Sequence, residues 1–303
     1  ELLFKTIKSK TFRSQIILIC CKKNLKYQMK KFKFKRNINL LDMKRIKNLK
    51  IKKNEINLVN VELKRSNNNQ FNEINIRNYI EECFKISFEI IDHKISNKLI
   101  NGPVDKNIFL KKKFLGVTEY ISNKSKIRKT GMLIFNKKLS VCPVTTHLPI
   151  KLVAKNISIK VIKEKVILVN NFYLKNLGYK PRIGVVGLNP HCETILKFDE
   201  DKKIISPALK SLIKKKINVK GPFSADTIFS RENRKKYDVI VGMYHDQVLT
   251  PIKTLFEFDA INVTMGLPFL RVTPDHGPNK KMFGQNISNP KSLINAFKFL
   301  NHR

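Results

Sequence analysis

Three histidines in this sequence each stand just after a short apolar run that is typical of a β-strand. They are His147 after SVCPVTT (140–146), His191 after RIGVVGLNP (182–190) and His245 after DVIVGMY (238–244). Uninterrupted Val, Ile and Leu with helical segments between them indicate parallel strands buried on both faces. Ligands bind beyond the carboxyl ends of such strands, so three imidazoles there could converge on one divalent cation. One histidine alone at a strand end is more often a hydrogen-bonded structural residue, and only the position shared by all three favours a metal site.

The composition is strongly basic. Lys and Arg number 61 against 23 Asp and Glu, which gives a formal charge of +38. A charge of this size is typical of proteins that bind nucleic acid or anionic membranes. The lysines are spread over the whole chain, however, without a basic stripe that contains aromatic residues, and they accompany an excess of Ile and Asn that AT-rich coding favours. We therefore expect no nucleic-acid partner and no membrane partner.

The five cysteines indicate a reducing compartment. They include one adjacent pair, Cys20 and Cys21, and form no CxxC motif, so neither a disulfide framework nor a thiolate zinc site is expected. The longest early apolar stretch, IILICC at 16–21, is far shorter than a membrane span. The sequence therefore predicts a cytoplasmic protein.

The composition changes near residue 101, because all 11 glycines and all 12 prolines lie beyond it. A hundred residues without Gly or Pro are unusual in a compact α/β fold, since Gly supplies positive φ and Pro favours turns. We therefore expect residues 1–101 to be a divergent, truncated N-terminal part and residues 102–303 to carry the site, and Glu1 in place of Met predicts a longer reading frame. Local patterns in the first part predict strands at SQIILICC and INLVNVEL, a helix at IRNYIEECFKISFEIIDHKI and a poorly packed charged connection over 30–54.

Beyond this boundary, eight motifs occur in one order. They are NGPVDKN (101–107), GVTEY (116–120), VTTHLPI (144–150), GLNPHCE (187–193), GPFSADTIF (221–229), MYHDQVLTPIK (243–253), INVTMGLPFLR (261–271) and DHG (275–277). In this order they resemble the 4-hydroxythreonine-4-phosphate dehydrogenase family, NAD-dependent enzymes of pyridoxal phosphate biosynthesis. The resemblance covers about two thirds of the chain. It implies an α/β fold of the isocitrate/isopropylmalate dehydrogenase type, with two subdomains around a largely parallel sheet, and a homodimer whose active site lies in the cleft and is shared between subunits.

The resemblance also implies roles for individual residues. The divalent ion, given in the family as zinc, magnesium or cobalt, would be bound by His147, His191 and His245. Substrate would be bound by Thr118, Lys253, Asn262 and Arg271, and NAD would be contacted by His276 and Gly277. Two cations and an amide suit a phosphate and a carboxylate. Asp246, next to a histidine ligand, would orient that ligand or help to move a proton.

The implied reaction is the NAD-dependent oxidation of 4-phosphohydroxy-L-threonine. Its 3-keto product would lose carbon dioxide to give 3-amino-2-oxopropyl phosphate, in pyridoxine 5'-phosphate biosynthesis. Two alternatives stay open: a sister dehydrogenase of another phosphorylated hydroxy acid, and a degenerate, non-catalytic relative or fragment.

The degenerate alternative follows from departures from the family pattern. Val117 stands where the family has the histidine of GHTE, and Val248 replaces the glycine of YHDQG. Pro278 removes a backbone donor from the cofactor loop. The glycine-rich opening segment of the family, of the form GDPxGIGPE, is missing from this sequence.

Overall fold

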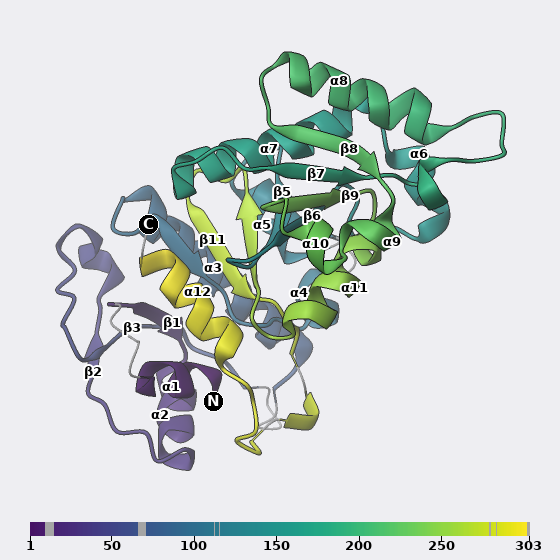
Figure 1. The fold of residues 1–303 in the computed structure, drawn as a ribbon. Helices are drawn as coiled ribbons and strands as arrows, with labels where there is room; N and C mark the ends of the chain where they lie inside the picture. Colours follow the sequence, from purple (N-terminus) through teal and green to yellow (C-terminus); the bar gives the residue numbers. More distant parts are fainter. Residues whose placement is uncertain are drawn as a thin grey trace. The chain divides into compact units, whose positions relative to one another are not determined.

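The chain is divided into two compact units in a computed structural model (Figure 1). Unit 1 consists of residues 1–117, 268–270 and 276–303, and unit 2 consists of residues 118–267 and 271–275. The structure describes residues 1–9, 15–65, 71–111, 113–114, 116–278, 280–282 and 284–301. Within these ranges, no helix is both long enough and apolar enough to cross a membrane.

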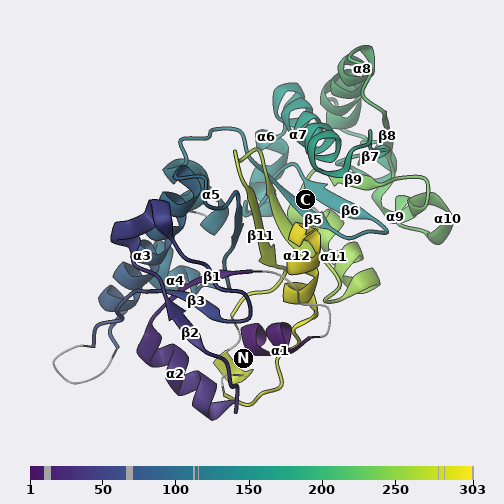
Figure 2. The same ribbon diagram turned by 90° about the vertical axis from the view of Figure 1, so that its left-hand side faces the viewer.

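Unit 1 contains a small parallel sheet in the order β1-β3-β2, with bounds Ile17–Cys20, Ile56–Asn60 and Ile38–Leu40. Its helices include α1 (Leu2–Lys8), α2 (Lys22–Lys31), α3 (Glu73–Asp92), α4 (Lys106–Leu110) and α12 (Lys291–Asn301), and it also holds strand β4 (Lys98–Ile100). Ile56 and Leu58 pack with Leu25 of α2, whereas Val59 packs with Ile86 of α3. Because successive side chains of a strand point to opposite faces, β3 supports both layers. Figure 2 shows the sheet between α2 and α3.

The predictions for the first part of the chain are mostly confirmed. Strands β1 and β3 lie in SQIILICC and INLVNVEL, apart from Ser14, which is outside the described residues, and α3 lies over the predicted helix. The prediction of a poorly packed connection over 30–54 is wrong. That segment contains β2 and a 3₁₀ segment at Met43–Asn48, and Phe34 and Leu41 are buried. Phe34 stands between two lysines and Leu41 precedes Asp42, so charged neighbours conceal the apolar residues that reach the core.

Residues 1–101, which contain no glycine, turn by placing other residues in the left-handed region. Lys33 has a φ of 47°, Asn54 of 69° and Lys94 of 58°. Each such conformation costs a residue with a side chain about 1–2 kcal/mol. The absence of glycine therefore does not prevent compact turns here, although it makes them more costly.

Unit 2 is built on strands in the order β11-β10-β5-β6-β9-β7-β8. Their bounds are Leu270–Pro274, Ile261–Met265, Gly131–Phe135, Ser140–Pro143, Val239–Gly242, Ile183–Val186 and Val219–Phe223. Strands β6, β9, β7 and β8 run parallel, and β5, β10 and β11 pair antiparallel. Val141, Ile240 and Val185, in three of the parallel strands, are fully buried. This confirms the prediction of parallel strands covered on both faces.

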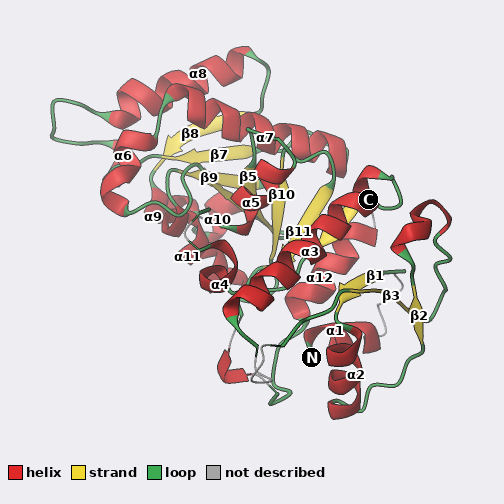
Figure 3. Ribbon diagram, turned by 180° about the vertical axis from the view of Figure 1, so that it is seen from behind, coloured by secondary structure: helices red, strands yellow, loops and turns green. Residues whose placement is uncertain are grey.

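Helices cover both faces of the parallel strands. The helices between Val117 and Phe256 are α5 (Val117–Lys124), α6 (Val153–Asn156), α7 (Ile159–Leu177), α8 (Ser206–Lys214), α9 (Ala225–Ile228), α10 (Arg231–Arg234) and α11 (His245–Phe256). Figures 1 and 3 show α7 and α8 on one face and α11 on the other. The Ser158 hydroxyl accepts a hydrogen bond from the Val161 N–H at the start of α7, and Gly178 ends this helix with a φ of 80°. The α/β class is confirmed.

Candidate metal and substrate site

The three predicted histidines follow neighbouring strands of unit 2. His147 lies four residues beyond β6, His191 five residues beyond β7, and His245 is the first residue of α11, three residues beyond β9. Strand β9 lies between β6 and β7, and both pairs are parallel. The carboxyl ends of these strands therefore meet at one edge of the sheet, where ligands of such sheets bind.

His147 and His245 lie close together at this edge. Their ring centroids are 6.0 Å apart, with an angle of 38° between the rings. A zinc-type bond to imidazole nitrogen is about 2.0–2.1 Å long, so two rings on one ion have centres roughly 5–6 Å apart. The Nδ1 atom of His245 lies 2.9 Å from Oδ1 of Asp246. A carboxylate on one ring nitrogen orients the ring and leaves Nε2 available for an ion.

His191 lies in a tight turn at Pro190–Cys192. It has a left-handed φ of 56°, its neighbour Cys192 has a φ of 62°, and its side chain is exposed. A hydrogen bond from the Ser224 hydroxyl and, to a lesser extent, the nearby His191 lower the pKa of Asp226. In the part of the chain that the structure describes, no three His, Cys, Asp or Glu side chains are arranged to hold a metal ion. The rings of His147 and His245 thus have a spacing compatible with one shared ion, and the role of all three histidines as ligands stays a prediction.

Arg271, in β11, is a buried cation held by hydroxyl groups. Its Nη1 donates to Oγ1 of Thr118 at 3.0 Å and to Oγ1 of Thr264 at 2.8 Å. Burial lowers the pKa of Arg271 to about 10, and the charge of Glu119 partly opposes that shift. The guanidinium therefore remains positive at neutral pH. Two of the residues expected to contact substrate, Thr118 and Arg271, are thus in direct contact.

Lys253 of α11 is paired with a carboxylate that the sequence reasoning missed. Its Nζ lies in ion-pair contact with the Asp275 carboxylate and donates to the Asp275 carbonyl at 2.5 Å. Asp275 is the first residue of the DHG motif, and its place in that motif could have indicated its role near Lys253. An anionic substrate group at Lys253 must therefore share the ammonium with Asp275. Asn262, in β10, has a buried side-chain oxygen that accepts no hydrogen bond from any described residue.

The residues expected to contact NAD belong to unit 1. The Nδ1 atom of His276 lies 3.2 Å from the Gly277 carbonyl oxygen. Its Nε2 atom is buried and forms no hydrogen bond with a described residue. A buried ring nitrogen without a partner is compatible with a cofactor contact. Asn279, which follows Pro278 in this loop, lies outside the described residues.

Val248 is accommodated within α11. Its side chain is fully buried, and its backbone does not have the positive φ that would require glycine. The space comes from Gly242, because a Cβ atom there would lie 2.4 Å from Cγ1 of Val248. The replacement of the family glycine at position 248 is therefore compatible with the backbone of this helix. Val117, the first residue of α5, is also buried.

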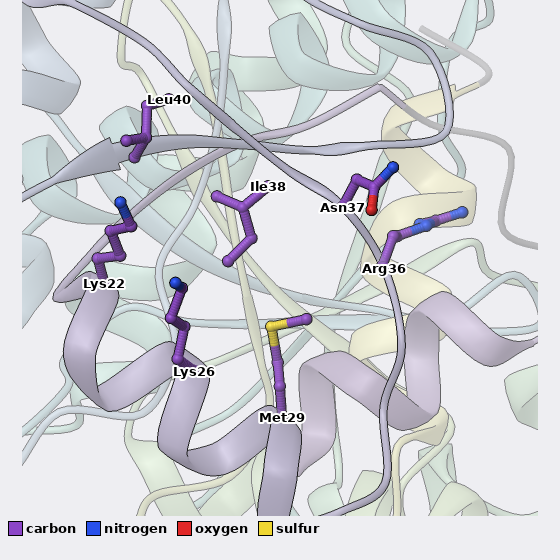
Figure 4. A pocket seen from close by; sticks show the side chains of 7 residues that line it. All are labelled: Lys22, Lys26, Met29, Arg36, Asn37, Ile38 and Leu40. Carbon is purple, nitrogen blue, oxygen red and sulfur yellow. The ribbon is translucent and has the colours of Figure 1, made fainter.

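A shallow hollow in unit 1 lies between α2 and the segment that enters β2 (Figure 4). Its lining residues are Lys22, Lys26, Met29, Arg36, Asn37, Ile38 and Leu40. The three cations among them make the hollow basic. None of the residues predicted to bind metal, substrate or NAD contributes to this lining.

Comparison with known sequences identifies the family. Residues 13–300 match the family described as "Pyridoxal phosphate biosynthetic protein PdxA". A 4-hydroxythreonine-4-phosphate dehydrogenase of Sulfurihydrogenibium sp. (strain YO3AOP1) is 38% identical over 222 residues, 72% of this chain and 67% of the relative. One from Xanthobacter autotrophicus is 37% identical over 66% of this chain and 60% of the relative. A relative in Oceanobacillus iheyensis has the name "Putative D-threonate 4-phosphate dehydrogenase". It is 34% identical over 71% of this chain and 66% of its own length.

Solved structures show the same fold. The 4-hydroxythreonine-4-phosphate dehydrogenase of Klebsiella pneumoniae has a TM-score of 0.83 at 23% identity, with 100% of this chain and 94% of that chain covered. The enzyme of Burkholderia phymatum has a TM-score of 0.78 at 24% identity, with 98% and 92% covered. The fold is therefore of the isocitrate/isopropylmalate dehydrogenase type, as the sequence predicted.

The family match also extends the predicted resemblance toward the amino terminus. We expected it from residue 101 onward, and it begins at residue 13, so it includes the small sheet of unit 1. The sequence alignments span about 60–67% of the length of the first two curated relatives. The chain belongs to the PdxA family of pyridoxal phosphate biosynthetic proteins.

Proposed function

We propose that this protein is an NAD- and divalent-metal-dependent dehydrogenase of 4-phosphohydroxy-L-threonine. Membership of a pyridoxal phosphate biosynthetic family and the names of the curated relatives support this reaction. The observation that carries the proposal is the arrangement at the carboxyl edge of β6, β9 and β7. Each of these strands is followed by a histidine, and the rings of His147 and His245 have a spacing compatible with one shared ion.

The ion is proposed to be held by His147 and His245, with His191 as the third ligand. Three imidazoles favour zinc or cobalt over magnesium, which prefers oxygen ligands. When bound, the ion would lower the pKa of the substrate hydroxyl, and NAD would accept hydride from the carbon that carries it. Asp246 holds the His245 ring through Nδ1, so this carboxylate is proposed to fix the ring orientation.

The other site residues are proposed to hold the charged ends of the substrate. Arg271 presents a planar guanidinium already fixed by Thr118, which suits a carboxylate or a phosphate. Lys253 provides a second cation, and the unpartnered side-chain oxygen of Asn262 can accept a hydrogen bond from the substrate. His276 and Gly277 are proposed to contact NAD, since Nε2 of the histidine has no partner among the described residues.

The proposed product is a 3-keto acid that loses carbon dioxide. With NAD bound, oxidation would remove a hydride from C3, and a base would take the proton of the hydroxyl. The carbonyl is then β to the carboxylate, so the bond to that carboxylate breaks, carbon dioxide leaves and C2 gains a proton. The result is 3-amino-2-oxopropyl phosphate. The protein is proposed to act as a homodimer with a shared active site, which sedimentation can test.

One relative favours a second candidate, a dehydrogenase of D-threonate 4-phosphate. The two substrates share the phosphate, the carboxylate and the oxidised hydroxyl, and they differ at C2, which carries an amino or a hydroxyl group. Arg271 and Lys253 suit the shared groups and do not separate the candidates.

The experiment is NADH formation from each substrate by protein stripped with EDTA and then supplied with Co²⁺, Zn²⁺ or Mg²⁺. We expect metal-dependent turnover of 4-phosphohydroxy-L-threonine and its loss in His245→Ala. Preference for D-threonate 4-phosphate would support the second candidate. A folded dimer that oxidises neither substrate with any of the metals would support the non-catalytic alternative, which the changes at Val117 and Pro278 raise.

A further inference from the structure

One side-chain amide joins two of the loops that carry the histidines. Gln247 lies in the first turn of α11, two residues after His245. Its Nε2 donates to the carbonyl of Gly187 at 2.7 Å, and its Oε1 accepts from the Met243 N–H at 2.7 Å. Gly187 directly follows β7, and Met243 directly follows β9. The amide therefore crosslinks the exits of two neighbouring strands.

Two further side chains extend this crosslink on either side. The buried Thr145 hydroxyl donates to the Met243 carbonyl at 2.7 Å, which ties the loop of His147 to the same turn. Asp201 is 1% exposed, and its carboxylate accepts from Leu188 N–H at 2.9 Å and Asn189 N–H at 3.1 Å. It also accepts from the Asn189 amide at 3.0 Å. All three histidine loops are thus held by side-chain bonds to backbone groups.

The loop of His191 is pressed closely against this network. A Cβ atom on Gly187 would lie 2.4 Å from Oδ1 of Asp201 and 2.7 Å from Sγ of Cys192. Only a residue without a side chain leaves the carboxylate room to reach the next two backbone amides. Beyond the braced segment the His191 side chain is exposed, with a left-handed backbone.

We propose that Gln247 is a positioning residue that sets the separation between the His191 and His245 loops, with Asp201 holding the His191 side of that link. The inference rests on the proposed function for the identity of the ion. Ligand positions must be kept within about 0.2 Å of ideal distances for a metal site to form well. Loss of groups that orient metal ligands typically weakens metal binding about 10–100-fold.

The chain offers a matched control for Gln247. Asn136 is buried in the same unit, and its amide also bridges two backbone groups: Nδ2 donates to the Asp259 carbonyl at 2.8 Å and Oδ1 accepts from the Lys138 N–H at 2.9 Å. Asn136 lies just after β5 and bonds none of the histidine loops. Gln247→Met and Asn136→Leu each remove two such bonds while nearly preserving side-chain volume.

The first test is titration of the parent and both variants with Co²⁺, in which the visible absorption of the bound ion reports binding. The second is hydrogen exchange of the peptide spanning 187–193 in the same three proteins. We expect Gln247→Met to bind Co²⁺ about 10–100-fold more weakly and to exchange faster in that peptide. Asn136→Leu should match the parent in both measurements, even if its unfolding midpoint falls as far as that of Gln247→Met.

Two results would overturn the positioning role: unchanged exchange at 187–193 in Gln247→Met, or an equal loss of Co²⁺ affinity in Asn136→Leu. The proposed metal site itself would be contradicted if the parent protein bound no Co²⁺, or if His245→Ala bound Co²⁺ as tightly as the parent does. In that case the exchange of 187–193 still decides whether Gln247 fixes the loop, because this measurement needs no metal.

Discussion

Gly242 and Val248 form a steric pair whose energetics can be measured. Gly242 ends β9, and an added Cβ atom would lie 2.4 Å from Cγ1 of Val248, 3.0 Å from Oε1 of Gln247 and 3.4 Å from Cγ2 of Val186. The first distance is far below van der Waals contact. Val248 is fully buried and cannot move its methyl group into solvent. The perturbation is therefore Gly242→Ala, alone and combined with Val248→Ala.

The expected magnitudes follow from packing. Overpacking by one methyl group costs about 1–3 kcal/mol, and the reduced freedom of the unfolded chain returns about 0.4–1 kcal/mol. Gly242→Ala should thus lower the free energy of unfolding by about 1–2 kcal/mol. Val248→Ala removes two buried methyl groups and should cost about 2 kcal/mol. In the double variant the new methyl group occupies vacated space, so the loss should stay near 2 kcal/mol, a coupling of about 1–2 kcal/mol.

Urea unfolding followed by circular dichroism measures all four proteins of this cycle. Each kcal/mol corresponds to about 2–4 °C in Tm for a domain of this size, so thermal scans provide a check. Gly102→Ala is the control, because a Cβ atom there meets no atom within 4 Å. Additive losses in the double variant, or a Gly242→Ala protein as stable as the parent, would refute the steric reasoning.

Three further predictions concern buried charge and thiols. Arg271→Leu should lower the free energy of unfolding, because the hydroxyls of Thr118 and Thr264 lose their donor and Glu119 loses a nearby positive charge, and it should raise the KM for phosphorylated substrate; an unchanged urea midpoint would contradict this. Lys253→Met should lower the free energy of unfolding by about 1–3 kcal/mol because the Asp275 carboxylate loses its ion pair, and the added change Asp275→Asn should recover part of this in the same assay. Iodoacetamide at pH 8 should modify Cys192 before Cys142, as mass spectrometry can show, because Cys142 is fully buried and burial raises the pKa of its thiol to about 12.

The strands that position the site could be predicted because their almost purely apolar residues indicate burial on both faces. SVCP, IGVV and VIVG are almost purely apolar, and each is followed by its histidine. Chain direction in a parallel sheet then brings the three loops to one edge. The spacing of 6.0 Å between the rings of His147 and His245 could not be predicted, because it depends on loop conformations that no periodicity describes.

The bracing residues were missed for a related reason. Gln247 and Asp201 bond backbone groups of loops, and those groups come within reach only after the strands have paired. Their side chains are ordinary polar residues in the sequence, without a periodic pattern. The signal that was available is Gln247 in the YHDQ motif and Gly187 in GLNPH, a glycine whose missing side chain leaves space for Asp201.

The way unit 1 is assembled from distant segments has a consequence during synthesis. Helix α1 packs against α12, and the Glu1 carboxylate accepts a hydrogen bond from the Ser288 N–H at 2.6 Å. On the ribosome, residues 118–267 of unit 2 are translated before α12 exists. At about 5–20 residues per second, the interval between the end of the first segment of unit 1 and α12 is roughly 10–40 s. For that time Phe4 and Ile7 can already pack with Leu25 and Ile56, but α1 lacks its native neighbour α12, and the helix face that α12 will cover is open to chaperones.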